Sequence, residues 1–468
     1  MNPAEWAAHD PDRVTRAQVQ RWLEADDPRL RERFAGPLTF GTAGLRGPIG
    51  AGETAMNVAT VTRATAGLAA WLGAGKRVVL GCDARHGSAA FRDATAEVLS
   101  AAGIEVLALP PQLPTPLTAF AVRHFAADAG VMITASHNPA TDNGYKVYDA
   151  SGSQIIPPSD SEIALLIDAA GWADEIPRSR SLIREVDVRE EYLARAVSLI
   201  DAPASQPVIV TTAMHGVGGA VLAEALRRAG FENVHPVVKQ AHPDPDFPTV
   251  AFPNPEEDGA LDLAFALAEQ IGADLILALD PDADRCAVAM PGRQFTGDEI
   301  GAILGWDAAS RASGGTLACS NVSSRLLGKI AAHHGLVFEE TPTGFKWIAR
   351  VPNLIFGYEE ALGYCVDPQW VADKDGITAC LKVAEVASRS SLETLLEELG
   401  ERFGYHLTKQ VAVRVAEPAG EMRVRENGPD RVIVRPSGTE PKIKYYYETI
   451  QPTRAQALDR LDQLLREA

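Results

Sequence analysis

Cysteine is scarce in this sequence and follows no recognisable pattern. The 468 residues include five cysteines, with no Cys-x-x-Cys pair and no zinc-like spacing. They are Cys82, Cys286, Cys319, Cys365 and Cys380. A disulfide framework and a structural zinc site are therefore excluded, and we predict reduced thiols in a cytoplasmic protein.

Long apolar runs and a targeting leader are also absent. No run approaches the roughly 20 apolar residues that span a bilayer. The first residues, Met1 to Trp6, lack the basic and then apolar order of a targeting segment. We therefore expect a soluble, untargeted protein.

Positive charge is in deficit, because the formal net charge is −18 and acidic residues are spread along the chain. This balance argues against nucleic acid or an anionic membrane as the main partner. No protein partner is evident either. If such an acidic protein binds a phosphorylated substrate, it must gather its cations locally.

What the sequence does contain is length and a regular rhythm. With 468 residues, of which 46% are hydrophobic, the chain is long enough for three or four domains with buried cores. A β-branched strand pattern at 77–81 is followed by a helical pattern near 88–102 and a second strand at 105–109. This order predicts βαβ units and a largely parallel sheet.

Similar units recur further along the chain. Their strands are expected at 207–211, 275–279 and 315–319, and the adjoining helices near 217–229, 260–271 and 322–334. From about 405, strands at 410–415 and 431–434 and an amphipathic helix at 453–467 predict a small α+β domain. A Pro-rich stretch at 201–207 and an Ala, Ser and Gly accumulation at 305–314 are typical of boundaries. The predicted domains are 1–202, 203–308, 309–404 and 405–468.

One buried-strand pattern, Val131 to Ile133, runs into the polar turn Thr134-Ala135-Ser136-His137-Asn138-Pro139. A hydroxyl is thereby placed at the end of a strand, where α/β sheets expose their sites. Ser136 and Asn138 could instead only make side-chain turns, and His137 could be a structural residue. For this segment alone, the structural interpretation is favoured.

Asp280, Asp282 and Asp284 follow the apolar strand 275–279 at every second position. In extended backbone such side chains point to one side, and carboxylates this close repel one another unless a divalent cation lies between them. Oxygen ligands favour Mg²⁺, and Arg285 adds an anion-binding group. A solvated acidic turn is the alternative, but the preceding buried strand favours the metal site.

Three further segments give weaker signals. Residues 435–441 follow a strand and offer a guanidinium, hydroxyls and free amides for a phosphate cradle, or else form a Pro/Gly turn. The Gly-bounded pair Glu359 and Glu360 can accept hydrogen bonds from sugar hydroxyls, or can begin a charged helix. The Gly-rich loop 40–47, which contains Arg46, carries little weight by itself.

Together and in this order, these segments resemble the α-D-phosphohexomutase superfamily, which includes phosphoglucomutases and phosphomannomutases, over nearly the whole chain. The resemblance implies three related α/β domains with mixed or parallel sheets and a smaller C-terminal α+β domain, around a central cleft. It also implies an intramolecular phosphotransferase. A phosphoserine donates to a sugar phosphate, and the resulting bisphosphate turns over and returns its other phosphate. Mg²⁺ and an activator such as glucose 1,6-bisphosphate are implied as well.

The resemblance assigns roles to individual residues. The implied metal ligands are Ser136, which carries the phosphoryl group, and Asp280, Asp282 and Asp284. The implied catalytic residues are Ser136, His137, Lys146, Arg46 and Lys374, of which His137, Lys146 and Lys374 are candidates for proton transfer. The implied substrate-binding residues are Thr42, Arg285, Thr343, Gly344, Glu359, Glu360, Lys374, Arg435, Ser437, Gly438 and Thr439. Lys374 could alternatively be a surface lysine. The cations expected to converge on the cleft are Arg46, Lys146, Arg285, Lys346, Lys374 and Arg435.

The loop Glu359-Glu360-Ala361-Leu362-Gly363 departs from the pattern, because Ala361 stands where phosphoglucomutases place a Ser hydroxyl. This loop and the loop 40–47 are more similar to the phosphoglucomutase-2 and phosphopentomutase branch. Our first hypothesis is a mutase of glucose or mannose phosphates, between the 1-phospho and 6-phospho forms. The second is a mutase of ribose or deoxyribose phosphates, from 1-phosphate to 5-phosphate. The third is a sugar-phosphate-binding regulator without catalysis.

Overall fold

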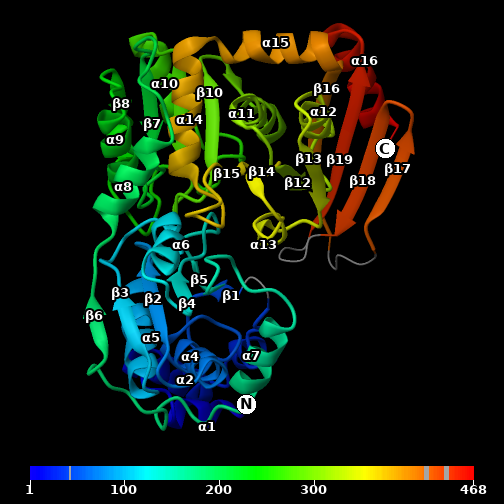
Figure 1. Ribbon diagram of the computed structural model, residues 1–468. Helices are drawn as coiled ribbons and strands as arrows, with labels where there is room; N and C mark the ends of the chain where they lie inside the picture. The colour runs from blue at the N-terminus through cyan, green and yellow to red at the C-terminus, as the bar shows by residue number, and fades with distance from the viewer. Residues whose placement is uncertain (42–43, 416–420, 437–441, 468) are drawn as a thin grey trace.

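The computed structural model describes residues 1–41, 44–415, 421–436 and 442–467, and in these residues the strands form four sheets in chain order (Figure 1). The first sheet, blue to cyan, lies below the other three in this view. The second and third stand above it, and the fourth, orange to red, lies beside the third. This arrangement confirms the predicted architecture of three α/β domains and a smaller C-terminal α+β domain.

The first sheet has the strand order β1-β5-β4-β2-β3-β6. Its strands are β1 (Leu45–Pro48), β2 (Arg77–Cys82), β3 (Glu105–Ala108), β4 (Ala129–Ile133), β5 (Asp142–Asp149) and β6 (Ile183–Glu185). Strands β4, β2, β3 and β6 are parallel, and β5 runs antiparallel to β4 and β1. Val78 and Leu80 of β2 pack into one core and Val79 into another, because successive side chains point to opposite faces. Both faces of this sheet are therefore covered.

The helices of the first unit begin before the sheet and continue beyond it. They are α1 (Pro3–Ala8), α2 (Arg13–Glu24), α3 (Arg29–Arg33), α4 (Val58–Leu72), α5 (Ser88–Ala101), α6 (Thr115–His124), α7 (Ser159–Asp168) and α8 (Arg189–Ser198). The first three precede β1 and pack around Trp6 and Trp22 in a small apolar cluster of their own.

The second and third sheets repeat the central part of the first. Their orders are β11-β10-β9-β7-β8 and β13-β12-β14-β15. The elements of the second unit are β7 (Ile209–Thr212), α9 (Gly219–Arg228), β8 (Val234–Pro236), the 3₁₀ turn η1 (Val238–Gln240), α10 (Asp262–Ile271), β9 (Leu275–Leu279), β10 (Cys286–Met290) and β11 (Arg293–Gln294). Those of the third are α11 (Gly297–Arg311), β12 (Thr316–Ser320), α12 (Leu326–His333), β13 (Val337–Thr341), α13 (Phe345–Ile348), β14 (Leu354–Glu359), β15 (Gly363–Cys365), α14 (Gly376–Arg389) and α15 (Leu392–Phe403).

In all three units, a parallel strand at the same position in the order turns back into an antiparallel neighbour. These pairs are β4 with β5, β9 with β10 and β14 with β15. The shared order β5-β4-β2-β3, β10-β9-β7-β8 and β15-β14-β12-β13 shows that the units are related in topology. Three loops of the chain therefore occupy equivalent places in three sheets.

The fourth sheet is antiparallel throughout its described strands, in the order β16-β19-β18-β17. Its elements are β16 (Tyr405–Arg414), β17 (Arg423–Asn427), β18 (Asp430–Pro436), β19 (Lys442–Gln451) and α16 (Arg454–Arg466). Leu461 and Leu464 of α16 pack against Val432 and Tyr447 on one face of the sheet. On the other face, Ile433 and Tyr446 pack against Val322 of the third unit.

The domain boundary predicted at residue 308 falls inside α11. This helix begins with a capping box between Thr296 and Glu299 and packs on β14 of the third sheet. Gly305 allows close packing of α11 against α12 as well, because a Cβ there would lie 2.4 Å from Leu327 Cδ1. The part of this stretch from Gly305 to Arg311 is therefore helical and does not form a linker. The other predicted domain limits stay predictions.

A continuous core joins the first three units. One cluster of buried side chains includes Phe120 of α6, Leu277 of β9 and Phe356 of β14. The three sheets are thus held at fixed positions around the space between them. Among the described helices, none has both the length and the apolar character needed to cross a bilayer.

Candidate active site

A cleft of about 620 Å³ lies between the four units and is lined by residues from each of them. Its volume is within the range of small-molecule sites. The cations that line it include Arg46, Lys146, Arg285, Lys346, Lys374 and Arg435. The structure thus brings to one cleft all six cations that the sequence singled out.

Ser136 lies in the loop between β4 and β5, and its backbone is left-handed with φ +53°. Its amide donates to Thr134 Oγ1 at 2.9 Å. The hydroxyl donates to Asp280 Oδ2 in the second unit at 2.9 Å and lies 3.3 Å from His137 Nδ1. The Ser136 hydroxyl therefore does not serve only its own turn, because it contacts the acidic loop of the second unit.

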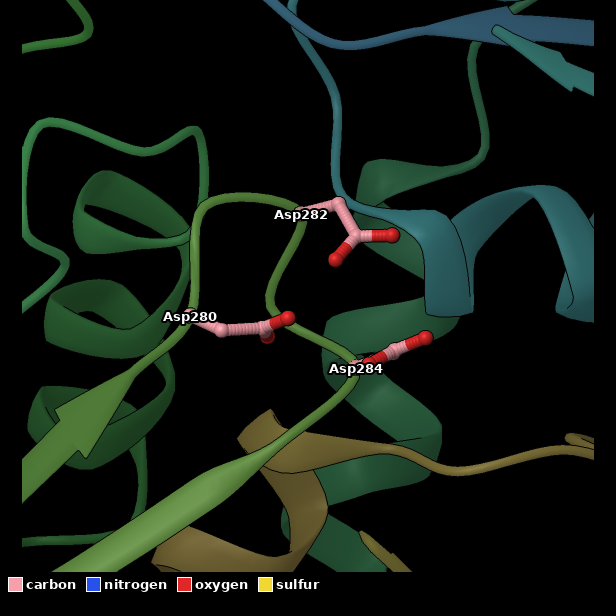
Figure 2. Close-up of side chains that lie close together, drawn as sticks. All are labelled: Asp280, Asp282 and Asp284. Atoms are coloured by element: carbon pink, nitrogen blue, oxygen red, sulfur yellow. The ribbon is translucent and has the colours of Figure 1, made fainter. Parts of the chain in front are cut away.

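Asp280, Asp282 and Asp284 converge in the loop between β9 and β10 (Figure 2). One carboxylate oxygen from each lies within 4.8 Å of the others. The loop is not extended, contrary to the expectation from the regular spacing of the aspartates. Ala283 N–H donates to the carbonyl of Asp280 at 2.9 Å, and Ala283 has φ +60°. A tight turn therefore brings the carboxylates together, and alternation along a strand does not.

The three aspartates are buried, with exposures of at most 1%, so they do not form a solvated turn. Lys146 Nζ donates to Asp282 Oδ2 at 2.7 Å and to Asp284 Oδ2 at 3.0 Å, and Lys374 Nζ lies 3.4 Å from Asp284. Burial opposes ionisation, but these cations hold the pKa of Asp284 well below its usual range. Burial and the two neighbouring carboxylates raise the pKa of Asp280 well above its usual range.

Two carboxylate oxygens of this loop are left without hydrogen-bond donors. They are Asp282 Oδ1 and Asp284 Oδ1, both buried and without a hydrogen-bond partner among the described residues, although Arg285 Nε lies 3.8 Å from Asp284 Oδ1. A buried acceptor in this state calls for a ligand, a water or an ion. Because the atoms available as metal ligands are all carboxylate oxygens, they fit a hard divalent cation.

Arg46 and Lys146 reach the cleft from the paired strands β1 and β5. Arg46 Nη1 donates to Asn138 Oδ1 at 3.3 Å. The imidazole of His137 lines the same part of the cleft. Burial, together with Arg285 and Arg46, lowers the pKa of His137 well below its usual value, so the ring is neutral at neutral pH.

Lys374 is not a surface lysine, because only 8% of the residue is exposed. Its Nζ lies 3.3 Å from Asp373 and 3.4 Å from Asp284. Burial opposes the charge, but Asp284 and Asp373 raise the pKa of Lys374. Asp373 Oδ2 accepts from Tyr148 OH at 3.1 Å and Gln154 Nε2 at 2.9 Å in the first unit. Contacts between units thus fix Lys374 at the acidic loop.

Thr343, Gly344, Glu359 and Glu360 line the cleft from the third unit. Glu359 Oε1 accepts the Gly344 N–H at 2.9 Å, and Glu360 Oε2 accepts from Ser320 Oγ at 2.8 Å. Burial and the neighbouring Glu359 raise the pKa of Glu360 to about 7. The two glutamates therefore differ in their surroundings, although they are adjacent in sequence.

Arg435 lies near the end of β18, opposite Lys444 of β19, and both line the cleft with Lys442. The fourth unit therefore contributes three cationic side chains to the lining of the cleft. The predicted site residues that lie outside the described residues are Thr42, Ser437, Gly438 and Thr439. Their assignment stays a prediction.

Arg85 and Thr115 also support the site, although neither was predicted from the sequence. Thr115 begins α6, and its Oγ1 donates to Asp282 Oδ2 at 2.6 Å. Arg85 donates to the backbone carbonyl of Ser136 at 2.6 Å. A signal did exist, because Arg85 follows β2 and Thr115 follows β3, and the carboxyl ends of neighbouring parallel strands share one edge of a sheet.

The acidic segment 252–258 was also missed. It lines the cleft from the second unit, and Glu256 lies 3.7 Å from Arg285 Nη1. Its residues belong to a connection between η1 and α10, without the strand pattern that marked the other loops. No local signal in the sequence places this segment at the cleft.

Comparison with known proteins agrees with this architecture. Models of the phosphoglucomutase/phosphomannomutase family match the chain in four parts: alpha/beta/alpha domain I at 37–173, domain II at 190–293, domain III at 296–403 and the C-terminal domain at 382–466. A Haemophilus influenzae protein described as a "probable phosphomannomutase" is 42% identical over 450 residues, which cover 84% of this chain and 93% of that protein.

Human phosphopentomutase is 37% identical over 464 residues, which cover 87% of this chain and 75% of that protein. The crystal structure of a Thermus thermophilus protein described as a "putative phosphomannomutase" has a TM-score of 0.76 and 26% identity, and the match covers 92% of this chain and 100% of that chain. The chain therefore belongs to the phosphoglucomutase/phosphomannomutase family, and it is a phosphosugar mutase, an isomerase that moves a phosphoryl group within a sugar phosphate.

Proposed function

We propose that this mutase works through a phosphoserine at Ser136. The observation that carries the proposal is the 2.9 Å hydrogen bond from Ser136 Oγ to Asp280 Oδ2, which places this hydroxyl beside three buried carboxylates in a cationic cleft. In this proposal, phosphoserine donates to the free hydroxyl of a sugar phosphate. The bisphosphate then turns over in the cleft and returns its other phosphate to Ser136.

We propose Mg²⁺ as the metal, held by Asp280, Asp282, Asp284 and an oxygen of phosphorylated Ser136. When bound, Mg²⁺ neutralises charge on the phosphoryl group. The oxygens of Asp282 and Asp284 that lack a hydrogen-bond donor among the described residues support this assignment. Lys146 already touches both side chains and would remain beside the transferring group.

The cations around Ser136 have two proposed roles. Arg46 and Lys146 stabilise negative charge on the moving phosphoryl group. His137, Lys146 and Lys374 are the candidates for moving a proton to or from the sugar hydroxyl. Their supporting geometry is that His137 lies next to the Ser136 hydroxyl, while the two lysines lie on the acidic loop.

The remaining site residues are proposed to bind the substrate. The phosphate that is not being transferred would be held by Arg435, Ser437, Gly438 and Thr439, and the rest of the sugar phosphate by Thr42, Arg285, Thr343, Gly344, Glu359, Glu360 and Lys374. Because Ser136 must be phosphorylated before the first turnover, glucose 1,6-bisphosphate or a related bisphosphate is the proposed activator. The five cysteines are free, which suits action in the cytoplasm.

Intact-mass measurement tests the phosphoserine. Full-length protein is incubated with glucose 1,6-bisphosphate, with Mg²⁺ or with a chelator. We expect the wild type to gain one phosphoryl group, mapped to Ser136, faster with Mg²⁺, and Ser136→Ala to gain none. Equal gain by Ser136→Ala, or no gain by the wild type, would show that the covalent mechanism is wrong. The latter result would favour a sugar-phosphate-binding regulator.

We propose hexose phosphates of glucose or mannose as the substrates, in line with the 42% identical Haemophilus influenzae protein described as a probable phosphomannomutase. Pentose phosphates are the second candidate. They are favoured by Ala361, which lines the cleft without a hydroxyl, and by the name of the human relative, phosphopentomutase. Initial rates with Mg²⁺ and activator on glucose 1-phosphate, mannose 1-phosphate and ribose 1-phosphate separate the two. A clear preference for ribose 1-phosphate would show that the hexose proposal is wrong.

A further inference from the structure

The loop that carries Ser136 has an unusual backbone and a buried cation beneath it. Ser136 is a non-glycine residue with φ +53°, a left-handed conformation that L side chains adopt only when their surroundings impose it. Two hydrogen bonds within the loop support it, from Ser136 N–H to Thr134 Oγ1 and from Asn138 N–H to the Ala135 carbonyl. Neither bond supplies a donor to the backbone carbonyls of Ser136 and Asn138.

Arg85 supplies donors to four carbonyls of this segment. Its Nη2 donates to the carbonyls of Ser136 and Asn138, each at 2.6 Å. Its Nη1 donates to the carbonyls of Pro139 at 2.7 Å and Asp142 at 3.2 Å. One guanidinium therefore holds both ends of the turn that presents the Ser136 hydroxyl.

Arg85 is itself held in place by its neighbours. Asp83 Oδ1 accepts the Arg85 N–H at 3.0 Å, and Asp83 Oδ2 lies 3.4 Å from Arg85 Nε. The ring of Phe247, from the second unit, lies 5.0 Å from the guanidinium carbon. Only 1% of the Arg85 side chain is exposed, so water does not compete for its hydrogen bonds.

We propose that Arg85 is the positioning residue of the phosphoryl carrier, which fixes the left-handed turn so that Ser136 Oγ faces Asp280 and the cleft. This inference rests on the proposed role of Ser136. A lysine could not replace Arg85, because an ammonium lacks the planar fork whose two arms reach two pairs of carbonyls. Within this loop the Arg85 guanidinium donates to backbone carbonyls, so it acts through Ser136 and not on the sugar.

The test compares Arg85→Lys with Arg92→Lys. Arg92 is also in the first unit, its side chain is 11% exposed, and its Nη2 donates to the Leu109 carbonyl at 2.9 Å, away from the cleft. For each variant, the rate of Ser136 phosphorylation by glucose 1,6-bisphosphate is followed by intact mass, and kcat and KM are measured on glucose 1-phosphate. The melting temperature of each variant is measured as well.

We expect Arg85→Lys to lower the phosphorylation rate and kcat about 100-fold, the loss that a displacement of about 1 Å causes at a reacting group. Its KM should stay within about threefold of the wild-type value, because the sugar and phosphate contacts lie elsewhere. Arg92→Lys should leave both rates unchanged. A general loss of structure would instead raise KM and lower the melting temperature together with kcat.

Phosphorylation of Arg85→Lys at the wild-type rate would overturn the inference. If Arg85→Lys does not fold, the same measurements are made on Arg85→Gln; failure of both to fold would also overturn it, since Arg85 would then be a structural residue. The proposed function fails separately, if the wild type gains no phosphoryl group or Ser136→Ala gains one. A phosphorylated wild type with an unaffected Arg85→Lys variant would refute the positioning role alone.

Discussion

Glu360 is a residue of the cleft whose ionisation opposes folding. Its Oε2 accepts from Ser320 Oγ at 2.8 Å and Ser323 Oγ at 3.3 Å, and burial beside Glu359 raises its pKa to about 7 from the ordinary value of 4.5. Between these two values, the unfolded chain loses the proton and the folded protein keeps it. The free energy of unfolding therefore falls as pH rises through this range, by no more than about 3 kcal/mol.

We expect Glu360→Gln to remove this pH dependence, because a glutamine keeps an acceptor for Ser320 and cannot ionise. Thermal unfolding without substrate should give nearly the wild-type melting temperature at pH 5 and a value roughly 5 °C above wild type at pH 8. Glu339→Gln, at an exposed position on β13, is the matched control and should follow the wild type. A difference between Glu360→Gln and wild type that does not change with pH would contradict the shifted pKa.

Individual residues could be predicted where their type and spacing indicate the chemistry. Asp280, Asp282 and Asp284 stood out because acidic side chains at regular spacing after a buried strand need an explanation. Arg85 could not be identified in this way. Its place after β2 indicates the edge of the sheet, but its role depends on backbone carbonyls up to 57 residues away, which the local sequence does not record.

At the scale of the elements, the strand and helix patterns gave the βαβ order but not the equivalence of the units. The loops that carry Ser136, the aspartate triad and Glu360 all follow the same strand of the shared order, namely β4, β9 and β14. No sequence repeat marks this equivalence. Strand order depends on pairing between distant segments, which hydrophobic periodicity does not record.

The acidic loop illustrates how an element can be predicted for an incorrect reason. Regular spacing along an extended strand suggested that the carboxylates face one side, but the chain turns between Asp280 and Ala283. Ala283 adopts a left-handed conformation that residue type alone would not suggest. Packing supports it, since Gly218 leaves room there: a Cβ on Gly218 would lie 2.5 Å from Ala283 Cβ.

At the scale of the whole molecule, the net charge of −18 and the cationic cleft are compatible because the cations come from all four units. Arg46 belongs to the first, Arg285 to the second, Lys374 to the third and Arg435 to the fourth. The residues could be named from the sequence. Their meeting depends on how the domains pack, so each domain contact at the cleft also affects binding of an anionic substrate.

Glu448 is the centre of the contact that holds the fourth unit to the third. Its Oε1 accepts from Ser324 Oγ at 2.8 Å and Arg325 N–H at 2.9 Å, and its Oε2 from Arg325 Nε at 2.7 Å. Arg431 Nη2 and His406 Nδ1 lie 3.0 and 3.1 Å away. Burial opposes its ionisation, but His406, Arg431 and Arg325 lower the pKa of Glu448 to about 2. The charge is therefore present at every physiological pH.

We expect Glu448→Gln to loosen the fourth unit, because Arg325 and Arg431 lose their shared counter-charge in a buried contact, at a cost of about 3 kcal/mol. Arg435 would then be placed less firmly at the cleft. Limited proteolysis should cut faster near residue 404, and KM for the sugar phosphate should rise about tenfold, or about 1.4 kcal/mol. Glu401→Gln, exposed on α15 next to the same junction, should change neither quantity. Wild-type proteolysis and KM in Glu448→Gln would show that other contacts hold this domain in place.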